Sequence, residues 1–547
     1  MLALLLLLAQ APSPHTAEGT RGVVAAVSPA AVDVGVATLK AGGTAVDAAV
    51  AVGFAEAVTW PEAGNVGGGG FMLVHPGNGQ PPTFFDFRET APAKATPDMF
   101  AGKIDYQSPL TAGVPGTVRG FALAHAKHGK RSWKELVEPA VKLARDGFPV
   151  TASLAKRLNG VLADPKTTNA EFRRVFGKPG GGEWAAGDTL TQPDLAKTLA
   201  AVAESPDAFY TGGPARLLAE EMAQSGGLVT LADLTKYQAK ERTPTHVTYR
   251  GHDVYGAPPP SSGGVTLGLM LNMLETEELA KHPRHSPETV HRLTEVMRRA
   301  FCERAKHLGD PDFVTVPTDL LLDKDYAKRL AAGIDPLKAT PSAALADELP
   351  LAEGGSETTH YSVVDAAGMA VSTTYTLENA FGCRVVVRGA GFVLNNEMTD
   401  FNHKPGVTDR RGDIGTPANR VAPGKRMLSS MSPTIVAQAG KPTLVTGSPG
   451  GRTIINTALC VVVNVLDYGM DVRAAVDAPR QHHQWFPDRL SLEPTGDLSA
   501  LADKLKAMGH TVARAGQGDA HTIRLDPATG KRTAAADKRA DGKAAAE

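Results

Sequence analysis

The chain has 547 residues, of which 42% are hydrophobic and 21% are charged. This composition is typical of a globular protein and excludes a chain that is disordered as a whole. The net charge of −1 argues against a bulk electrostatic partner such as duplex DNA, RNA or an anionic membrane surface. Length alone predicts about three or four domains, or one large fold with insertions.

The chain begins with a short apolar run, residues 2–8, followed by Ala9-Gln10-Ala11. The run is too short to span a bilayer as a helix, and no other segment is long and apolar enough to do so. An apolar run before an alanine-x-alanine site is typical of a secretory signal peptide, although no basic residue precedes it here. We therefore expect residues 1–11 to be a signal peptide of a periplasmic or secreted protein; the alternative is a frayed apolar terminus.

Helical patterns dominate the first part of the chain. Residues 23–57 are rich in alanine, and Ser28-Pro29 resembles a helix N-cap followed by proline at the first helical position. The second helix of this region is apolar nearly all round, which predicts that it is buried. Residues 116–230 and 285–345 are also expected to be mainly helical. We expect strands between these two regions and after the glycine-rich turn near residue 67.

The pattern changes near residue 340, where a polar linker begins. Residues 358–365 and 370–377 then read as two strands joined by a tight turn, which predicts a β-hairpin. Residues 389–396 are expected to form one of several further strands, and a helix begins near Thr453. Helices packed on antiparallel sheets fit this order of elements.

The last part of the chain, residues 530–547, is low in complexity and has almost no apolar bulk. Such a segment cannot contribute much to a hydrophobic core. We therefore expect its end to be disordered.

Two glycine-rich segments could carry chemistry. Residues 67–70 are four glycines, but neither a phosphate-binding P-loop nor a dinucleotide motif accompanies them. They are better interpreted as a place where another backbone comes close. Residues 447–451 lie between a strand and a helix, where adjacent backbone N–H groups can face a developing oxyanion. An ordinary glycine-rich loop is an equally good interpretation from spacing alone.

The histidines and cysteines do not have the spacing of metal ligands. The adjacent pair His482-His483 would point to opposite faces of a strand, so both cannot easily bind one ion. The three cysteines, Cys302, Cys383 and Cys460, cannot form a disulfide framework and are expected to be buried thiols. We therefore expect neither a metal nor another cofactor.

Thr358 stands where the linker ends and the hairpin begins. If the chain were cut before it, its α-amine would lie beside its own hydroxyl. The ordinary pKa of an α-amine is about 7.7–8.0, so the amine can accept a proton near neutral pH. Threonine with its own amine as base is a known nucleophile arrangement. Threonine is also simply a good strand former, and spacing alone favours that interpretation.

Motifs in a fixed order along most of the chain decide between these interpretations. They include "GGTAVDAAVAVGFAEAVTWPEAGNVGGGGFML", "DFRETAPAKAT", "GVPGTVRGF", "PPPSSGG", "LGDPDFV", "TTHYSVVD", "NNEMTDF", "LSSMSPT", "TGSPGG" and "APRQHHQW". One such motif can occur by chance, but the ordered set is highly specific. With it the chain closely resembles the γ-glutamyltranspeptidases, N-terminal nucleophile hydrolases that are made as proenzymes.

The resemblance implies a four-layer αββα sandwich of the α+β class and autocatalytic cleavage between Glu357 and Thr358. A large subunit of residues 12–357 and a small subunit of residues 358–547 would then form a heterodimer within one fold. Thr358 would attack the γ-glutamyl amide of glutathione or a related compound. The resulting ester would pass to water or to the amine of an amino acid or peptide.

Catalytic roles also follow from the resemblance. Thr376 matches the family threonine that hydrogen-bonds the nucleophile. Gly450 and Gly451 match the pair whose backbone N–H groups form the oxyanion hole.

The other matched residues would bind the substrate head group. Arg88, Ser429 and Ser430 match the residues that hold the α-carboxylate, and the planar fork of arginine suits this contact. Glu397 and Asp400 match the acceptors for the α-ammonium. Cations at one end and carboxylates at the other would recognise a zwitterion.

Two departures from the family pattern affect specificity. Glu378 stands where the family usually has an asparagine that contacts the head group; a third carboxylate there can hold an ammonium but adds repulsion with Glu397 and Asp400. Residues 402–426 should form a lid, yet they contain no aromatic residue. A leakier lid would favour hydrolysis over transfer.

Two alternative functions remain open. One is a cephalosporin acylase of the same family, acting on a glutaryl-type acyl chain, which Glu397 and Asp400 disfavour because such a substrate can lack the α-ammonium. The other is a protein that binds γ-glutamyl peptides without cleaving them. Thr358, Thr376 and the Gly450-Gly451 pair speak against it, because a binding protein has no need of a nucleophile.

Overall fold

The computed structural model describes residues 14–101, 104–345, 351–352, 357–403, 406, 408, 413–495 and 499–547. The expected signal peptide, residues 1–11, lies outside the described residues. No helix in the described part of the chain combines the length and the apolar composition that a membrane crossing requires.

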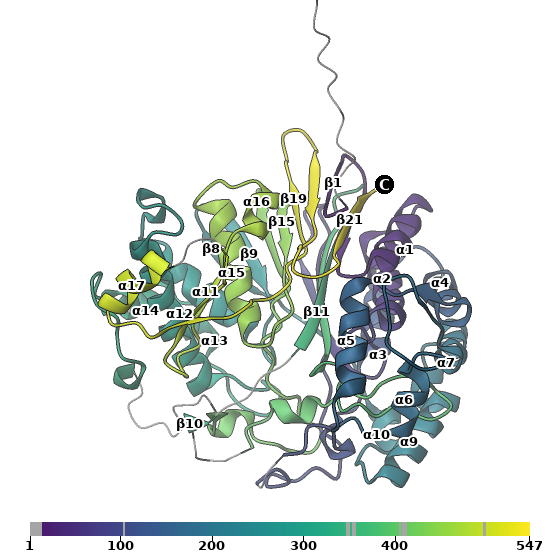
Figure 1. The fold of residues 1–547 in the computed structure, drawn as a ribbon. Helices are drawn as coiled ribbons and strands as arrows, with labels where there is room; N and C mark the ends of the chain where they lie inside the picture. The colour runs from purple at the N-terminus through teal and green to yellow at the C-terminus, as the bar shows by residue number, and fades with distance from the viewer. Residues whose placement is uncertain are drawn as a thin grey trace, which may run out of the picture.

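Two antiparallel sheets of seven strands form the centre of the molecule (Figure 1). The first sheet has the strand order β21 (Lys543–Ala546), β2 (Val23–Ala26), β11 (Glu357–Val364), β12 (Ala370–Glu378), β3 (Gly69–His75), β4 (Thr83–Phe87) and β7 (Lys240–Arg242). The second sheet has the order β1 (Thr16–Gly19), β20 (Arg532–Ala535), β19 (Thr522–Leu525), β15 (Lys441–Thr446), β14 (Thr434–Gln438), β9 (His252–Gly256) and β8 (Thr245–Tyr249). The expected hairpin, β11–β12, lies inside the first sheet.

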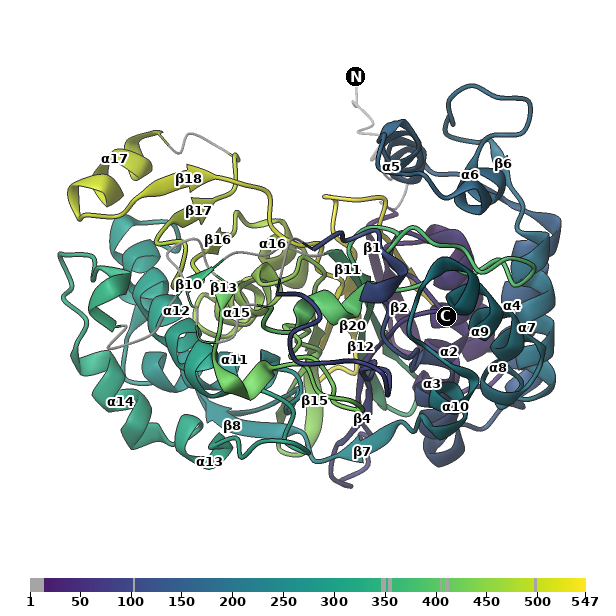
Figure 2. The same ribbon diagram turned by 90° about the horizontal axis from the view of Figure 1, so that it is seen from below.

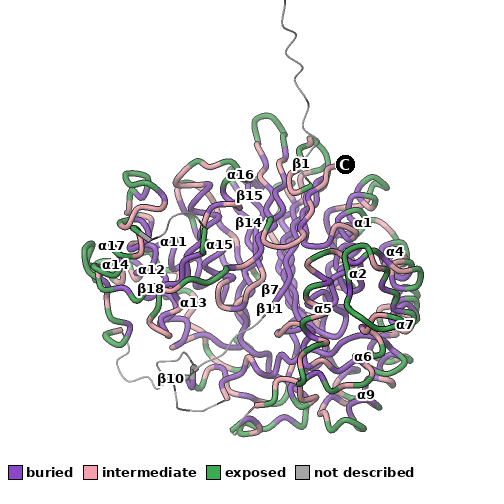
Figure 3. The backbone as a smooth tube through the Cα atoms, in the orientation of Figure 1, coloured by how far each residue is buried: buried purple, intermediate pink, exposed green. Residues whose placement is uncertain are grey.

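Alternation of side chains along the strands builds three apolar layers. In β3, Phe71 and Leu73 pack in the core that lies between the sheets, whereas Met72 and Val74 pack in the core under the first set of helices. In β14, Ile435 likewise lies between the sheets while the next residue packs under the other helices. Because successive side chains of a strand point to opposite faces, one strand serves two cores. The buried backbone in Figure 3 follows these strands.

Helices cover the outer face of each sheet, which gives the expected αββα layers (Figures 1 and 2). Those on the side of the first sheet are α1 (Pro29–Lys40), α2 (Ala45–Thr59), α3 (Thr117–His128), α4 (Trp133–Asp146), α5 (Ala152–Ala163), α6 (Ala170–Phe176), α7 (Pro193–Glu204), α8 (Ala208–Thr211), α9 (Gly213–Ser225) and α10 (Leu231–Lys236). Those on the side of the second sheet are α11 (Gly263–Leu274), α12 (Pro287–His307), α13 (Thr318–Leu321), α14 (Lys324–Ala332), α15 (Thr453–Leu466), α16 (Val472–Asp477) and α17 (Ser499–Ala507).

Short strands complete the structure at the edges. They are the pairs β5 (Phe148–Pro149) with β6 (Thr189–Leu190) and β10 (Leu351–Ala352) with β13 (Asp413–Ile414), and a group of β16 (Gln481–His482), β17 (Leu490–Leu492) and β18 (Val512–Arg514). Strands from the beginning, middle and end of the chain share the central sheets. The chain is therefore one large fold and not the three or four domains that its length suggests.

The first helices form as their sequences predict. Ser28 caps α1, with its Oγ accepting a hydrogen bond from the N–H of Ala31 at 3.4 Å, and Pro29 is the first helical residue. Every residue of α2 is buried, including Glu56. A helix that is apolar nearly all round has no face suited to water, so burial on all sides was expected.

The expected disorder of the C-terminal tail is wrong. Strands β20 and β21 lie in different sheets, and β21 pairs with β2 through the register Val23 to Ala546. A buried ion pair between Arg480 and Asp537, 2.5 Å apart, holds the segment between the two strands. Small alanine side chains fit where neighbouring layers come close, so the tail packs without apolar bulk.

The strand expected at residues 389–396 is also wrong. Only an isolated bridge, between Val386 and Val393, forms there. Gly389 and Gly391 have φ values of 74° and 76°, in the left-handed region that a regular strand cannot contain.

Candidate active site

Thr358 lies at the start of β11 beside the expected partner Thr376 on β12. Its Oγ1 donates a hydrogen bond to Oγ1 of Thr376 at 3.3 Å, and the N–H of Glu378 donates to the same Thr376 oxygen at 2.8 Å. The register between the strands shifts here, since Glu357 pairs with Glu378 and Thr359 with Tyr375. The extra residue on β12 makes a bulge that faces Thr358, a feature often found beside active sites.

The four glycines at residues 67–70 allow β3 to lie close to its neighbours. A Cβ atom on Gly68 would lie 2.1 Å from the carbonyl oxygen of Thr376, and one on Gly70 would lie 2.5 Å from that of Thr374. No real side chain tolerates such distances, so the expected close backbone approach is confirmed. The glycines thereby fix the position of β12 and of Thr376.

The loop between β15 and α15 places two left-handed glycines beside Thr358. Gly450 has a φ of 120° and Gly451 a φ of 57°, conformations that suit glycine. Among the described residues, none accepts a hydrogen bond from the N–H of either glycine. Thr358 and Gly450 both line a cavity of about 1230 Å³. Two N–H groups at a strand-to-helix junction can stabilise an oxyanion near this threonine.

A second cavity, called the main cavity below, brings the other predicted residues together. Its volume is about 950 Å³, and Thr358 lines both cavities. The predicted residues that line it are Arg88, Thr358, Thr376, Glu378, Glu397, Asp400, Ser429, Ser430 and Gly451. Parts of the expected lid also contribute, namely Asn402, His403, Thr416 and Asn419. Lid residues 404–405, 407 and 409–412, and the side chain of Glu357, lie outside the described residues.

Arg88 lines the main cavity and is almost fully buried. Its Nη1 lies 2.5 Å from a carboxylate oxygen of Glu397, and its Nη2 lies 2.5 Å from one of Asp400. A third carboxylate, that of Glu89, lies 3.6 Å from Nη1. This guanidinium therefore shares its charge among three carboxylates.

Glu378 and Glu397 are buried carboxyls with shifted pKa values. Burial is the main cause that raises the pKa of each group well above its usual range, and the neighbouring Asp400 adds to the shift. Arg88 opposes the shift in both cases. Glu378 also has a φ of 79°, a conformation in which asparagine is several-fold enriched over most residues. This backbone preference is a physical reason for the asparagine that the family usually has there.

Sequence reasoning missed two cationic residues of the main cavity. Arg304 on α12 and Arg452 before α15 both line the main cavity. Neither stands in a motif with a recognisable spacing, and a charged residue on an amphipathic helix normally faces solvent. The role of Arg304 becomes visible only in the tertiary structure, where its side of α12 is buried against Ser429 and Ser430.

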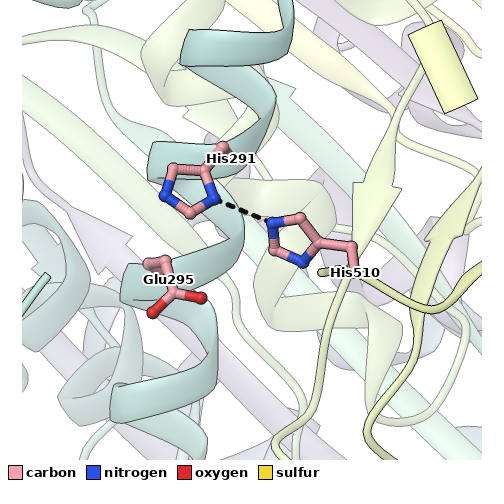
Figure 4. Close-up of side chains that lie close together, drawn as sticks. All are labelled: His291, Glu295 and His510. Atoms are coloured by element: carbon pink, nitrogen blue, oxygen red, sulfur yellow. Dashed lines mark hydrogen bonds between the residues drawn. The ribbon is translucent and has the colours of Figure 1, made fainter. Parts of the chain in front are cut away.

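One group of side chains in the described part of the chain has the geometry of a metal site. It consists of His291 and Glu295 on α12 and of His510, whose ligand atoms lie within 4.8 Å of one another (Figure 4). The two histidines hydrogen-bond each other at 2.8 Å, and Glu295 pairs with Arg298 and Arg299. These contacts already use the ligand atoms, and none of the three residues lines either cavity.

A comparison with protein families agrees with this site. The site combines the Thr358–Thr376 pair, the loop with Gly450 and Gly451, and the charged main cavity. Residues 31–547 match the family model described as Gamma-glutamyltranspeptidase. The chain belongs to the gamma-glutamyltranspeptidase family. It is an enzyme of this type, with the αββα sandwich of the N-terminal nucleophile hydrolases.

Individual relatives within the family support the same conclusion. The glutathione hydrolase proenzyme of Escherichia coli (strain K12) is 47% identical over 522 residues, which cover 94% of this chain and 90% of the relative. The acylase ACY 1 proenzyme of Pseudomonas sp. (strain SE83) is 36% identical, covering 96% of this chain and 93% of the relative. Similarity to the hydrolase is thus greater than similarity to the acylase.

A solved structure confirms the fold over almost the whole chain. The cephalosporin acylase from Bacillus halodurans superposes with a TM-score of 0.84 at 27% identity, and 98% of each chain is covered. The gamma-glutamyltranspeptidase sandwich therefore carries both hydrolase and acylase activities, and the residues of the site must decide between them.

Proposed function

We propose that this family member cleaves γ-glutamyl amides such as glutathione, with Thr358 as the nucleophile after the bond between Glu357 and Thr358 is cut. The observation that carries the proposal is the position of Thr358. It is hydrogen-bonded to Thr376 and lines the main cavity together with Arg88 and three acidic residues. The proenzyme relative at 47% identity supports it.

The proposed maturation uses the same hydroxyl as catalysis. Oγ1 of Thr358 attacks the carbonyl carbon of Glu357, the peptide C–N bond breaks, and an ester forms while the nitrogen becomes the α-amine of Thr358. Water then hydrolyses the ester and leaves Glu357 with a carboxylate. The products are the large subunit, residues 12–357, and the small subunit, residues 358–547.

In the catalytic cycle the α-amine of Thr358 takes the hydroxyl proton as Oγ1 attacks the γ-carbonyl of the substrate. The N–H groups of Gly450 and Gly451 stabilise the oxyanion. The C–N bond of the amide breaks, and the proton passes to the leaving amine. Water or an acceptor amine then attacks the γ-glutamyl ester, which restores the threonine hydroxyl.

The proposed substrate specificity depends on a zwitterionic head group. An α-carboxylate finds donors in Arg88, Ser429 and Ser430, and an α-ammonium finds acceptors in Glu397 and Asp400. Binding an ammonium beside Glu378 would also favour the ionised form of that carboxyl, whose pKa burial raises. This set of three acids supports a γ-glutamyl substrate over a glutaryl chain.

The first experiment tests processing. Purified wild-type protein should show a fragment of about 20 kDa on a denaturing gel, the share of the 57.2 kDa chain that residues 358–547 represent. Thr358→Ala should remain one band and be inactive, whereas Thr359→Ser should still be cut. Processing that survives in Thr358→Ala would exclude this residue as nucleophile.

The second experiment tests specificity by comparing the kcat/KM of mature enzyme for glutathione and for a glutaryl amide. Preference for the glutaryl amide would favour the acylase function instead. Titration with an acceptor peptide would test whether the lid without an aromatic residue favours hydrolysis. Export, proposed from the apolar run at residues 2–8, is tested by locating the protein in cell fractions and sequencing its mature N-terminus.

A further inference from the structure

Arg304 is a buried cation in the main cavity. It is 6% exposed, and within the described residues no acidic side chain forms an ion pair with it. Arg88 in the same cavity is surrounded by Glu89, Glu397 and Asp400. Burial lowers the pKa of the Arg304 guanidinium to about 9; Arg452 adds to this shift and the carboxylate of Asp400 opposes it. A buried positive charge is costly unless a negative group offsets it.

The hydrogen bonds of Arg304 connect it to both serines of the proposed head-group site. Its Nη2 donates to Oγ of Ser430 at 3.0 Å, and its Nε donates to Oγ of Ser262 at 2.8 Å. Ser262 in turn donates its own hydroxyl to the carbonyl oxygen of Ser429 at 2.6 Å, and its N–H to the same oxygen at 2.8 Å. One guanidinium on α12 thus holds the hydroxyl of one serine and, through Ser262, the backbone of the other.

These bonds also determine whether each serine hydroxyl acts as a hydrogen-bond donor or as an acceptor. Oγ of Ser430 accepts from Arg304, and Oγ of Ser429 accepts from the N–H of Met431 at 3.1 Å. Neither hydroxyl donates to any residue in the described part of the chain. A hydroxyl has one hydrogen to donate, and here that hydrogen remains available in both serines. Both serines line the main cavity, so an anion in the cavity can accept from them.

We propose that Arg304 is a positioning residue for the α-carboxylate of the substrate: it orients Ser429 and Ser430 as donors and supplies the positive charge that Arg88 shares with its acidic neighbours. The inference rests on the proposed function, because it assumes a substrate with an α-carboxylate. It assigns to the large-subunit part of the chain a role in arranging serines of the small-subunit part. A purely structural role for Arg304, as an anchor of α12, is the competing explanation.

Three chromogenic substrates separate these explanations because they differ only in the head group. γ-Glutamyl-p-nitroanilide carries both the carboxylate and the ammonium, glutaryl-p-nitroanilide carries only the carboxylate, and 4-aminobutanoyl-p-nitroanilide carries only the ammonium. The kcat and KM of mature wild-type enzyme and of Arg304→Gln are measured for each. Arg329→Gln, an exposed position on α14, is the matched control.

A role in carboxylate binding predicts a selective loss. Arg304→Gln should lower kcat/KM about 30-fold for the two substrates with a carboxylate, mainly through KM, a size typical of a lost hydrogen bond to a charged group. The loss for the 4-aminobutanoyl substrate should stay within about threefold. Arg304→Lys, which keeps the charge but not the fork, should lie between wild type and Arg304→Gln.

Equal losses for all three substrates, or no loss for any, would overturn the inference. If Arg304→Gln fails to fold or to be processed, Ser262→Ala provides the same test, since it removes the bridge from Arg304 to Ser429 and should again affect only substrates with a carboxylate. Wild-type enzyme that cleaves the glutaryl but not the γ-glutamyl substrate would refute the proposed function alone, and the glutaryl substrate would still test Arg304. Wild-type enzyme that cleaves none of the three would refute both.

Discussion

Glu56 is a carboxyl buried in the last turn of α2, directly behind the strand that carries Thr358. Its side chain is completely buried, and its Oε2 accepts a hydrogen bond from Oγ1 of Thr359 at 3.3 Å. Its Oε1 has no hydrogen-bond partner among the described residues. Burial raises the pKa of Glu56 from 4.5 to about 8, and Asp519 adds to the shift while the bond from Thr359 opposes it. Replacement by glutamine keeps the shape but removes the titration.

The raised pKa has a definite effect on stability. Between pH 4.5 and about 8 the folded protein keeps the Glu56 proton whereas the unfolded chain has lost it. Folding therefore takes up a proton, and the free energy of unfolding falls by about 1.4 kcal/mol for each pH unit in this window. The contribution is fully present below pH 4.5 and is lost as the pH rises through 8. From pH 5 to pH 8 the calculated loss is about 3.5 kcal/mol.

Urea unfolding, followed by tryptophan fluorescence, measures this effect. Glu56→Gln and its parent are compared at pH 5 and pH 8 in the Thr358→Ala background, which should keep the protein as one chain. The difference in unfolding free energy should move by about 3.5 kcal/mol in favour of glutamine between the two pH values, and Glu220→Gln, at an exposed site, should show no such movement. A difference that changes by less than about 1 kcal/mol would refute the reasoning.

Three further predictions concern the site. Glu378→Asn should raise the free energy of unfolding by about 1 kcal/mol, because asparagine adopts the φ of 79° more readily; an unchanged or lower value in urea unfolding would contradict this. Gly68→Ala should lower it by about 2 kcal/mol or more and impair processing on a gel, because the new Cβ meets the carbonyl of Thr376; normal stability with full processing would contradict the close-packing argument. Arg88→Lys should raise the KM for γ-glutamyl substrates about tenfold, because a point charge loses the planar fork; an unchanged KM would exclude carboxylate binding by Arg88.

Local sequence patterns predicted the helices and strands whose formation depends mainly on neighbouring residues. The hairpin at β11–β12 follows from β-branched residues on both sides of a tight turn, and the cap at Ser28 follows from the chemistry of a helix start. The buried helix α2 was readable because its apolar residues leave no polar face. These elements carry or support Thr358 and Thr376, so the backbone that holds the two threonines was predictable.

Contacts between distant parts of the chain determined the structure in the two places where the sequence-based prediction was wrong. The tail of the chain has little apolar bulk, yet β21 pairs with β2, more than 500 residues away in the sequence, and completes the first sheet. Residues 389–396 look like a strand in composition, but Gly389 and Gly391 turn the backbone out of extended geometry. Neither outcome can be read from a window of neighbouring residues.

The sequence by itself determined the position of Thr358, the ordered motifs and the residue types of the proposed head-group site. These features depend on short segments of the sequence. The side-chain types of a segment are the same wherever the fold places it. Only the tertiary structure decided how the charges are arranged. Arg88 forms ion pairs with Glu397 and Asp400, whereas Arg304 forms no ion pair with an acidic side chain among the described residues and instead hydrogen-bonds Ser430. The strength of a buried charge depends on which groups are packed around it, and that neighbourhood exists only when distant segments meet.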